Sequence, residues 1–487
     1  MSLRPATRIF SLVCGTLLLI VAAGCGTGRV NLSNSSGNFS NASLKGAYAY
    51  QIHGTSQLGP YRESGVLTAD GAGRISAGID DFVTASTGLV TNSVTGSYKV
   101  ANDGTGFLTF GPTPMGTITL AVTLVSKSKF DLIEADAFAN SAGTAELQTT
   151  TAMPSGTYVY RLHQIGASSG QNPVSEVGAI TISGGNVTGS FDQNFGGSSG
   201  QLTLTGTLSP PDSSGTGTGS FTDNTNFTTQ FVYYAVNSGK FLLLVTNLGL
   251  VESGSAELQS GAASGGLAGT YVFGSRGDSG TFYDAVGRVG QFNASTGTIS
   301  SYNDDSMSFG NYANSSLTGS YTASSNGRVA VTLGSGVLQA VFWMISPSRA
   351  FFLINNPSIV EDGTADLQNG SSFAASTFNG QFAMVMDGND SQSIFGPEFL
   401  SRVGTLQFNG LGTLALNEVV NASNSGAGAT SPGALSGNYQ VSSGGRIVGS
   451  LNGSTLNLVM YAVSGSSAYV LQVDPATNTS GIVELQQ

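Results

Sequence analysis

The strongest constraint on the fold is a six-residue phrase that occurs four times. It reads GTAELQ at 143–148, GSAELQ at 254–259, GTADLQ at 363–368 and GIVELQ at 481–486. Each phrase closes a segment that opens on a short motif around a glycine, namely LKGAY, PSGTY, LAGTY and FNGQF. These glycines are spaced by 110, 113 and 111 residues. A period of this length exceeds that of a propeller blade or a solenoid coil and is typical of a complete small domain.

Two more landmarks recur in the same order. A motif such as VTGSY lies in the middle of each segment, and a long apolar stretch lies near its end. Four landmarks in one order, repeated four times, predict four tandem modules of about 110 residues each. The modules are expected at residues 44–148, 153–259, 267–368 and 378–487.

Each module is predicted to be all-β. In the first module, turn signals such as DGAG and NDGTG separate eight candidate strands. Apolar side chains alternate along them, as at Tyr48, Tyr50 and Ile52, and no segment after the first 24 residues has helical periodicity. Eight short strands joined by tight turns predict an eight-stranded up-and-down antiparallel barrel. The alternative is a β-propeller built from half-repeats, against which the unequal halves of the module argue.

The barrel hypothesis explains the repeated phrase. It would form the last strand of its module and pair with the opening strand, which closes the sheet and removes its open edges. Leu147 would then point into the barrel, and Glu146 and Gln148 would point outward into water. In its number of strands and its opening phrase, a module resembles the eight-stranded barrels of the avidin and lipocalin class.

The first 24 residues have the pattern of a lipoprotein signal peptide. Arg4 and Arg8 precede an apolar stretch of 15 residues, which is shorter than the ~20 residues that a spanning helix needs. The stretch ends in VAAGC, which resembles the lipobox of bacterial lipoproteins. The resemblance implies that cleavage leaves Cys25 as an acylated, palmitate-bearing N-terminus. The alternative is a plain secretory signal or an uncleaved anchor. Residues 25–43 are rich in Gly, Ser and Asn and are expected to form a flexible tether.

The two cysteines of the chain agree with an exported, lipid-anchored protein. Cys14 lies in the segment that would be removed, and Cys25 is the other cysteine of the chain. The mature protein therefore cannot form an internal disulfide, although it is expected to be exported. Gly26 follows Cys25, where an Asp would resemble an inner-membrane retention signal. We therefore expect a location in the outer membrane or at the cell surface, as in the tandem-repeat surface lipoproteins of environmental bacteria, which the whole chain resembles.

Composition excludes nucleic acid as a partner. The net charge is −11, only 9% of the residues are charged, and no basic run follows the first thirty residues. Binding to phosphates needs clustered Lys and Arg. The 40% of hydrophobic residues argue for folded modules rather than disorder.

The sequence offers no convincing catalytic set. His53 and His163 lie five residues after the tyrosine of their opening phrases, and Arg276 and Asp387 occupy the same position in the other modules. A position that varies so freely is expected to be a surface position. The chain has no HExxH motif or Cys/His cluster, and its GxSxG match at 196–200 lies in a Gly/Ser-rich loop without a helix. We expect neither an enzyme nor a bound cofactor.

A recurring acidic position gives a weak calcium hypothesis. Asp80, Asp192 and Asp304 each follow a turn glycine by seven residues, and Asp81 and Asp305 come next in two copies. Paired carboxylates in a loop could begin a calcium site. The preferred interpretation is that these aspartates cap hairpin turns by accepting hydrogen bonds from main-chain amides.

Aromatic side chains offer a second hypothesis. Tyr234, Trp343 and Tyr461 occupy one equivalent position in the long apolar strand, where the first module has Thr123. An exposed ring there could stack on a sugar or another flat ligand, whereas an inward ring would fill the barrel. Core packing is the preferred interpretation.

Two classes of function follow. The first is a structural or adhesive role for a repeat protein of the cell envelope that is attached to the membrane by its N-terminal lipid. Its partner would be a glycan, a small molecule or an envelope protein. The alternative is small-molecule or glycan binding inside the barrels. The two differ in whether each barrel is filled by side chains or hollow.

The lipobox predicts the behaviour of one variant. Cys25→Ser removes the only thiol that can be acylated after cleavage, so we expect it to abolish labelling by a palmitate analogue and to move the protein out of the membrane fraction. Cys14→Ser is the matched control and leaves both unchanged. Undiminished labelling of Cys25→Ser would overturn the lipid anchor.

Overall fold

The computed structural model describes residues 38–487 except 114–115, 165–171, 262–265, 280–284, 391–397, 423–427, 453–455 and 476. The predicted signal peptide, Cys25 and most of the predicted tether lie outside the described residues. Within the described part of the chain, no helix is both long enough and apolar enough to cross a bilayer.

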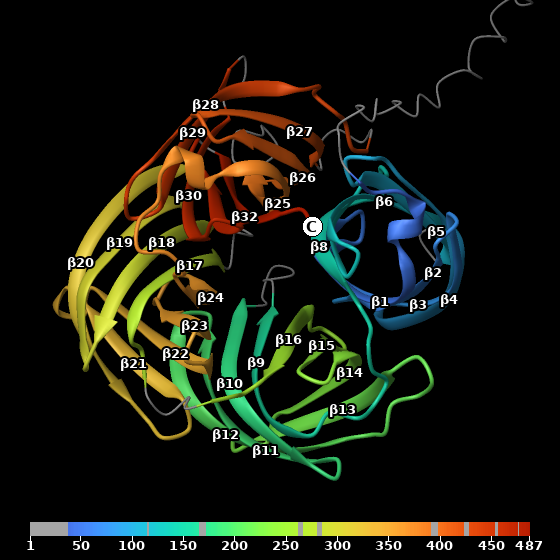
Figure 1. Cartoon of the computed structure of the whole chain (residues 1–487). Coiled ribbons are helices and arrows are strands. Elements are labelled where there is room, and N and C mark those ends of the chain that lie inside the picture. Colours follow the sequence, from blue (N-terminus) through green and yellow to red (C-terminus); the bar gives the residue numbers. More distant parts are fainter. Residues whose placement is uncertain are drawn as a thin grey trace, which may run out of the picture. The chain divides into compact units, whose positions relative to one another are not determined.

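The described residues form four closed antiparallel barrels of eight strands each (Figure 1). Barrel 1 consists of β1 (Lys45–Ser56), β2 (Gly59–Asp70), β3 (Arg74–Thr84), β4 (Gly88–Val100), β5 (Thr105–Thr113), β6 (Gly116–Ser126), β7 (Lys129–Glu134) and β8 (Ala139–Leu147). Barrel 2 consists of β9 (Gly156–Gln164), β10 (Val174–Ser183), β11 (Asn186–Phe195), β12 (Ser198–Leu208), β13 (Thr216–Asp223), β14 (Thr228–Asn237), β15 (Lys240–Val245) and β16 (Glu252–Leu258).

The other two barrels repeat this order. Barrel 3 consists of β17 (Gly269–Asp278), β18 (Val286–Ser295), β19 (Thr298–Ser308), β20 (Asn311–Ala323), β21 (Arg328–Leu333), β22 (Leu338–Ser346), β23 (Arg349–Asn355) and β24 (Val360–Leu367). Barrel 4 consists of β25 (Asn379–Asp390), β26 (Glu398–Asn409), β27 (Thr413–Ala422), β28 (Leu435–Val441), β29 (Arg446–Asn452), β30 (Asn457–Ser464), β31 (Ser467–Gln472) and β32 (Thr477–Leu485).

Each barrel closes where its first strand pairs with its last strand. In barrel 1, Tyr48 of β1 lies opposite Leu147 of β8. The equivalent pairs close the other barrels. The predicted up-and-down barrel is therefore confirmed, and the propeller alternative is wrong, because each module closes on itself.

A glycine and a leucine meet at every closure. The opening glycine has a positive φ in all four barrels, which a residue with a side chain adopts only under strain. A Cβ there would also press on the leucine of the closing phrase. The values are φ +118° and 3.0 Å to Leu147 Cδ1 at Gly46, +115° and 3.2 Å to Leu258 Cδ1 at Gly156, +108° and 2.9 Å to Leu367 Cδ1 at Gly269, and +137° and 3.0 Å to Leu485 Cδ1 at Gly380.

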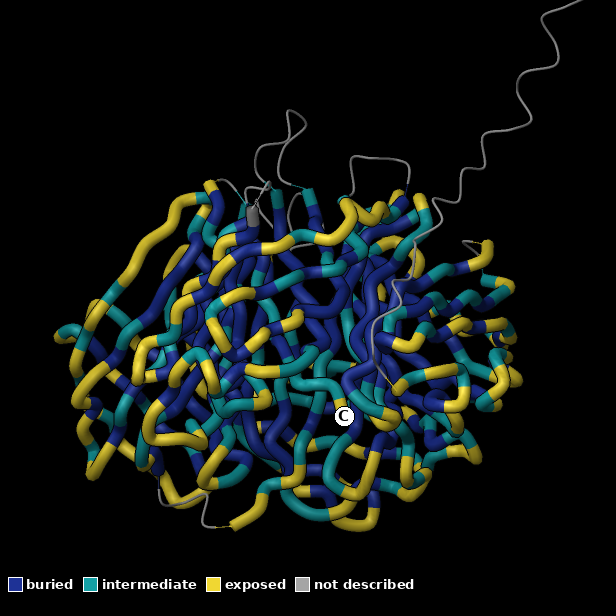
Figure 2. Tube along the Cα trace, turned by 45° about the horizontal axis from the view of Figure 1, so that its top comes forward, coloured by how far each residue is buried: buried dark blue, intermediate teal, exposed yellow. Residues whose placement is uncertain are grey.

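Each barrel encloses its own apolar core. Buried apolar side chains from its strands form one cluster, and the strands carry buried residues along their length, dark blue in Figure 2. Tyr50, Phe110 and Leu120 lie in the core of barrel 1, and Leu147 packs against it as predicted. Burial of this apolar surface is the main stabilising contribution to a barrel of this kind.

All odd-numbered strands run toward one rim of their barrel, which we call the upper rim, and all even-numbered strands run toward the lower rim. The upper rims of neighbouring barrels lie side by side. Asn194 Nδ2 at the upper end of β11 donates to the carbonyl oxygens of Ile354 and Asn356 in barrel 3. In the same way, the amide of Ala429 donates to the carbonyl of Ala135 in barrel 1.

The end of the predicted tether is docked on the lower rim of barrel 1. Residues Asn41–Ser43 form the 3₁₀ turn η1. Tyr98 Oη donates to the carbonyl of Leu44 at 2.8 Å, and Asn41 Oδ1 accepts a bond from the amide of Val100 at 2.8 Å. Phe39 packs against the core. The expectation of a flexible segment up to residue 43 therefore fails for its last residues, which seal the barrel end.

The barrels also contact one another in a closed cycle within one compact unit. Four buried apolar clusters join barrel 1 to 2, barrel 2 to 3, barrel 3 to 4 and barrel 4 to 1. Val83 packs with Val236 in the first of these clusters, and Ile133 packs with Val403 in the last. The four modules therefore form a ring rather than independent beads.

The closure geometry predicts the effect of one substitution. Gly156→Ala places a Cβ 3.2 Å from Leu258 Cδ1 at a φ of +115°, so we expect it to lower the free energy of unfolding by about 1–3 kcal/mol. Gly200→Ala is the matched control in the same barrel, since its Cβ meets nothing within 4 Å, and we expect a change within about 0.5 kcal/mol. Urea denaturation measures both, and equal effects would contradict this account of the closure.

Candidate functional site

The closing phrase holds neighbouring barrels together. Its glutamine side chain donates from Nε2 to two main-chain carbonyls of the next barrel in every copy. The bonds are Gln148 to Ser214 and Ala235 (2.9 and 2.7 Å), Gln259 to Asn326 and Met344 (3.2 and 2.8 Å), Gln368 to Gly444 and Ala462 (3.1 and 2.8 Å), and Gln486 to Asp103 and Leu124 (3.0 and 2.7 Å). Gln486 carries the pattern from barrel 4 back to barrel 1.

The acid of the phrase is also an interface residue. Glu146 pairs with Lys240 of barrel 2, Glu257 pairs with Arg349 of barrel 3 at 2.9 Å, and Glu484 pairs with Lys129 of barrel 1. At the remaining junction, Tyr469 Oη of barrel 4 donates to Asp366 at 2.6 Å. The expectation that Glu146 and Gln148 face water is therefore wrong, because the outer face of the closing strand is covered by the next barrel.

The predicted stacking aromatics and the predicted calcium ligands meet each other across three junctions. Tyr234 Oη donates to Asp81 Oδ2 at 2.5 Å, Trp343 Nε1 donates to Asp192 Oδ2 at 2.9 Å, and Tyr461 Oη donates to Asp305 Oδ2 at 2.7 Å. All three aromatic side chains are fully buried. Each ring lies in a buried apolar cluster between two barrels. The burial expected of core packing is therefore confirmed, but the rings pack at a junction rather than inside a barrel.

Two arginines strengthen this contact. Arg328 binds Asp192 through Nε and Nη2 at 2.8 and 2.6 Å, and Arg446 binds Asp305 through the same atoms at 2.7 Å each. Such bidentate arginine–carboxylate pairs fix the relative orientation of the two side chains and are stronger than single hydrogen bonds. Among the described residues, no group of three or more His, Cys, Asp or Glu is arranged to hold a metal ion. Asp81, Asp192 and Asp305 bond the junction aromatics, whereas Asp80 bonds Tyr50 and Asp304 pairs with Arg288 inside their barrels.

The predicted alignment of the aspartates contains a slip. Asp80 and Asp304 lie opposite Gly65 and Gly290 and point into their barrels. Asp192 instead lies at the outward position that Asp81 and Asp305 occupy in their own barrels. The cause is a bulge in the strand pairs of barrels 1 and 3, which adds one residue and is absent from the β10–β11 pair of barrel 2.

The junction between barrels 4 and 1 is built differently. The aromatic position is Thr123 in barrel 1, and the aspartate position is Val419 in barrel 4. Two asparagines bond across this junction, of which Asn421 is equivalent to Asn194 in barrel 2. Asn140 Nδ2 donates to the carbonyls of Phe399 and Asn421 at 2.5 and 2.8 Å, and Asn421 Nδ2 donates to those of Glu134 and Ala139 at 2.7 and 2.9 Å.

Charged groups remain inside the barrels, beside the apolar cores. Equivalent inward positions hold Glu63, Glu176, Arg288 and Arg402. In barrel 3, Arg288 pairs with Glu361 at 2.9 Å and with Asp304. In barrel 1, where the described residues place no cation among the inward carboxylates, burial raises the pKa of Glu63 well above its usual value. A raised pKa favours the uncharged acid, which costs less to bury than the carboxylate.

The two histidines converge on the middle of the ring. His53, His163, Arg276 and Asp387 occupy equivalent positions on the first strands of the four barrels. His53 Nε2 lies 2.7 Å from Asp387 Oδ2, and Arg276 pairs with the same carboxylate. The side chains of His53 and His163 are 16% and 14% exposed. The surface interpretation is therefore wrong. The residue at this position differs between the four copies because basic and acidic side chains from different barrels pair with each other.

His163 links barrels 2 and 3. Its Nε2 lies 2.6 Å from Asp278 Oδ2, and its Nδ1 lies 2.5 Å from Asp362 Oδ2 and 2.7 Å from Ser175 Oγ. Burial lowers the pKa of His163, but the carboxylates of Asp362 and Asp278 outweigh it and raise the pKa to about 9. For His53, burial and the Arg276 guanidinium lower the pKa to about 4.

A serine beside a histidine suggests an activated nucleophile, but this cluster lacks the required chemistry. The imidazole is protonated at neutral pH and cannot accept the hydroxyl proton. Ser175 Oγ instead donates to Asp362 Oδ2 at 2.5 Å, and Ser175 is fully buried. The arrangement is a satisfied buried charge cluster that can position barrels against each other.

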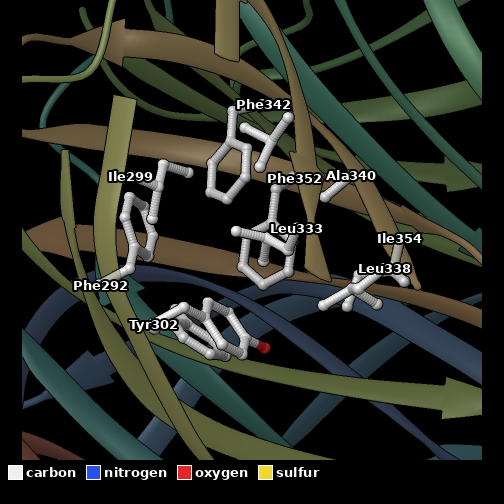
Figure 3. A pocket seen from close by; sticks show the side chains of 11 residues that line it. Phe292, Ile299, Tyr302, Leu333, Leu338, Ala340, Phe342, Phe352 and Ile354 are labelled. Atoms are coloured by element: carbon white, nitrogen blue, oxygen red, sulfur yellow. The ribbon is translucent and has the colours of Figure 1, made fainter. Parts of the chain in front are cut away.

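The interior of barrel 3 leaves little room for a ligand. The interior void of barrel 3 measures about 20 Å³ and is lined by rings and aliphatic side chains such as Phe292, Tyr302 and Phe352 (Figure 3). This volume is close to that of one water molecule. An avidin-like or lipocalin-like pocket would be many times larger.

A much larger cavity lies between the barrels. Its volume is about 390 Å³, and all four barrels contribute to its wall through their first and last strands. The lining includes Lys129, Arg161, Lys240, Glu257 and Asp387. The sequence contained a signal for this site, since Lys129, Lys240 and Arg349 begin equivalent strands in a chain with few charges.

Comparisons with known proteins add no family. No protein-family model matches the chain, and a search of curated protein sequences finds no match. Among solved structures, a double mutant of transferrin binding protein B from Haemophilus parasuis Hp5 is 8% identical, with a TM-score of 0.17 over 74% of this chain and 83% of that chain. CghA is 8% identical, with a TM-score of 0.13 over 90% and 88%. Scores this low support no inference.

The pKa of His163 predicts a pH dependence. Because the folded state raises this pKa to about 9, its stabilising contribution is complete below about pH 6.5, the ordinary value, and is lost as the pH rises through about 9. We expect the Tm of the wild type to fall more steeply over this range than that of His163→Gln. His53→Gln is the control, since His53 titrates near pH 4. Parallel curves for His163→Gln and the wild type would contradict the cluster.

Proposed function

We propose that the chain is a lipid-anchored protein of the cell envelope with an adhesive or structural role. In this role, the ring of barrels presents one rim to a glycan or an envelope protein. The filled interior of barrel 3 and the interlocked junctions support the proposal, because they favour the outer surface and the middle of the ring as the places where a partner could bind.

The upper rim carries the observation on which the proposal depends. Six large apolar side chains are exposed there, at strand ends or turns. They are Leu58 (53%), Phe195 (48%), Phe227 (52%), Leu248 (73%), Phe309 (46%) and Val337 (82%). They are spread over the upper rims of barrels 1, 2 and 3, so they offer several separate apolar contacts to a partner, and several weak contacts on one chain can add up to firm binding.

The position of the first described residues fits this orientation. Residues 38–43 dock at the lower rim of barrel 1, so the described part of the chain begins at the lower rim. A lipid on Cys25 would leave the upper rim free to meet a partner. The alternative function, binding of a small molecule inside each barrel, receives no support from the filled interior of barrel 3.

A binding assay tests the role of the upper rim. Mature protein carrying Cys25→Ser is mixed with washed envelope fragments from the cells that produce it, and saturable co-sedimentation is measured. We expect the triple variant Phe227→Ser, Leu248→Ser and Val337→Ser to bind at least about tenfold more weakly, because it removes apolar contact area.

The matched control is Leu411→Ser, whose side chain is 86% exposed at the lower rim, between β26 and β27. We expect this variant to bind like the parent. Absence of saturable binding by the parent would overturn the proposed role. Equal loss in the control would show that the upper rim is not the interacting surface.

A further inference from the structure

The cavity between the barrels concentrates charge in a chain that has little of it. Five of the 17 Lys and Arg residues line its wall, namely Lys129, Arg161, Lys240, Arg276 and Arg349. Carboxylates from three barrels face them. A packed junction needs only enough charge to satisfy its pairs, so an open volume of about 390 Å³ at this place calls for a separate explanation.

Most of the cations are committed to partners. Lys129 and Lys240 each hold the acid of a closing phrase, and Arg276 holds Asp387. Arg349 bridges Glu257 and Asp366, with Nε and Nη1 at 2.9 and 2.8 Å from them. These pairs shape the wall of the cavity and keep its groups in place.

Arg161 is the exception. Its Nη1 lies 3.3 Å from Asp362 Oδ1 and makes one long hydrogen bond of 3.5 Å to Thr364 Oγ1. A guanidinium has five N–H donors, and the described residues offer the others no hydrogen bond. Asp362 is also shared, since its Oδ2 already meets His163 and Ser175.

The guanidinium is nevertheless held in place. Its central carbon lies 5.2 Å from the centre of the Phe351 ring, a contact that stabilises a cation over an aromatic face. The side chain of Arg161 is 31% exposed, and it lines the cavity. A fixed guanidinium with free donors in a partly enclosed space is the usual device for binding a carboxylate through two parallel hydrogen bonds.

The other residues of the cavity wall limit the kind of ligand that can bind. Ser255 and Thr144 offer hydroxyls, and Glu257 and Glu484 offer carboxylate oxygens that accept hydrogen bonds. Acids on the wall disfavour a doubly charged anion such as phosphate, because like charges repel. They favour a singly charged ligand that also brings its own hydroxyl or amino donors. The volume is in the range of small-molecule sites.

We propose that the central cavity binds a small polar carboxylate that carries hydroxyl or amino groups, with Arg161 holding the carboxylate. This site is separate from the upper rim and does not depend on what the rim binds. It exists only in the complete ring, because all four barrels contribute to its wall.

The test uses the full mature chain with Cys25→Ser and isothermal titration calorimetry. D-galacturonate and L-glutamate are the probes. D-galactose is the control for D-galacturonate, because it lacks the carboxylate. We expect saturable binding of at least one probe and none of D-galactose. Arg161→Gln should weaken that binding by about tenfold or more, the loss expected when a charged hydrogen bond is removed, and Arg161→Lys should weaken it less.

Arg74→Gln is the control variant, since Arg74 is exposed on β3 and does not line the cavity. It should bind like the parent. Near-ultraviolet circular dichroism and the Tm show that each variant keeps its fold. Failure of both probes to bind the parent overturns the proposal, and so does equal binding by Arg161→Gln and the parent. The rim variants should bind the probe normally, which separates this result from the envelope assay.

Discussion

The arrangement of the molecule depends on one hydrogen-bonding contact, the glutamine that ends each closing phrase. The closing strand of each barrel also has an outer face. On that face, the glutamine side chain donates hydrogen bonds to two main-chain carbonyls of the next barrel. The same six residues thus close one sheet and join it to another. Because the contact occurs once per module, four copies generate four similar junctions, and the ring follows from repetition of a local rule.

The scarcity of charge follows from the same arrangement. Ion pairs are found at the junctions, around the central cavity and inside barrels 3 and 4. A pair that is out of water contributes little net stability, but it penalises any arrangement that leaves one member alone. Asp192 with Arg328 and Trp343, and Asp305 with Arg446 and Tyr461, therefore select one relative placement of neighbouring barrels over others that bury similar apolar area.

The barrels could be predicted from the sequence, because the information for them is local. Alternation, turn motifs and the repeated phrases identify eight strands and their closure without knowledge of any neighbour. The junctions could not be predicted in the same way. Alternation places Glu146, Gln148 and Tyr234 on a face but does not say whether water or a second barrel covers it. The one-residue bulge that displaces Asp192 from the position of Asp80 is likewise invisible to spacing. One signal was available, since an identical polar residue in all four copies is unusual for a face that meets only water.

The different junction between barrels 4 and 1 has a consequence for how the ring is assembled. Three junctions join modules that are adjacent along the chain, whereas the fourth brings together Asn140 and Asn421, 281 positions apart. Contacts of such long range form late, since the intervening chain must be ordered first. The last junction is also the one without the aspartate–aromatic contact, and its formation closes the ring. Closure of the ring therefore uses a contact, made by Asn140, that differs from the aspartate–aromatic contact between consecutive modules.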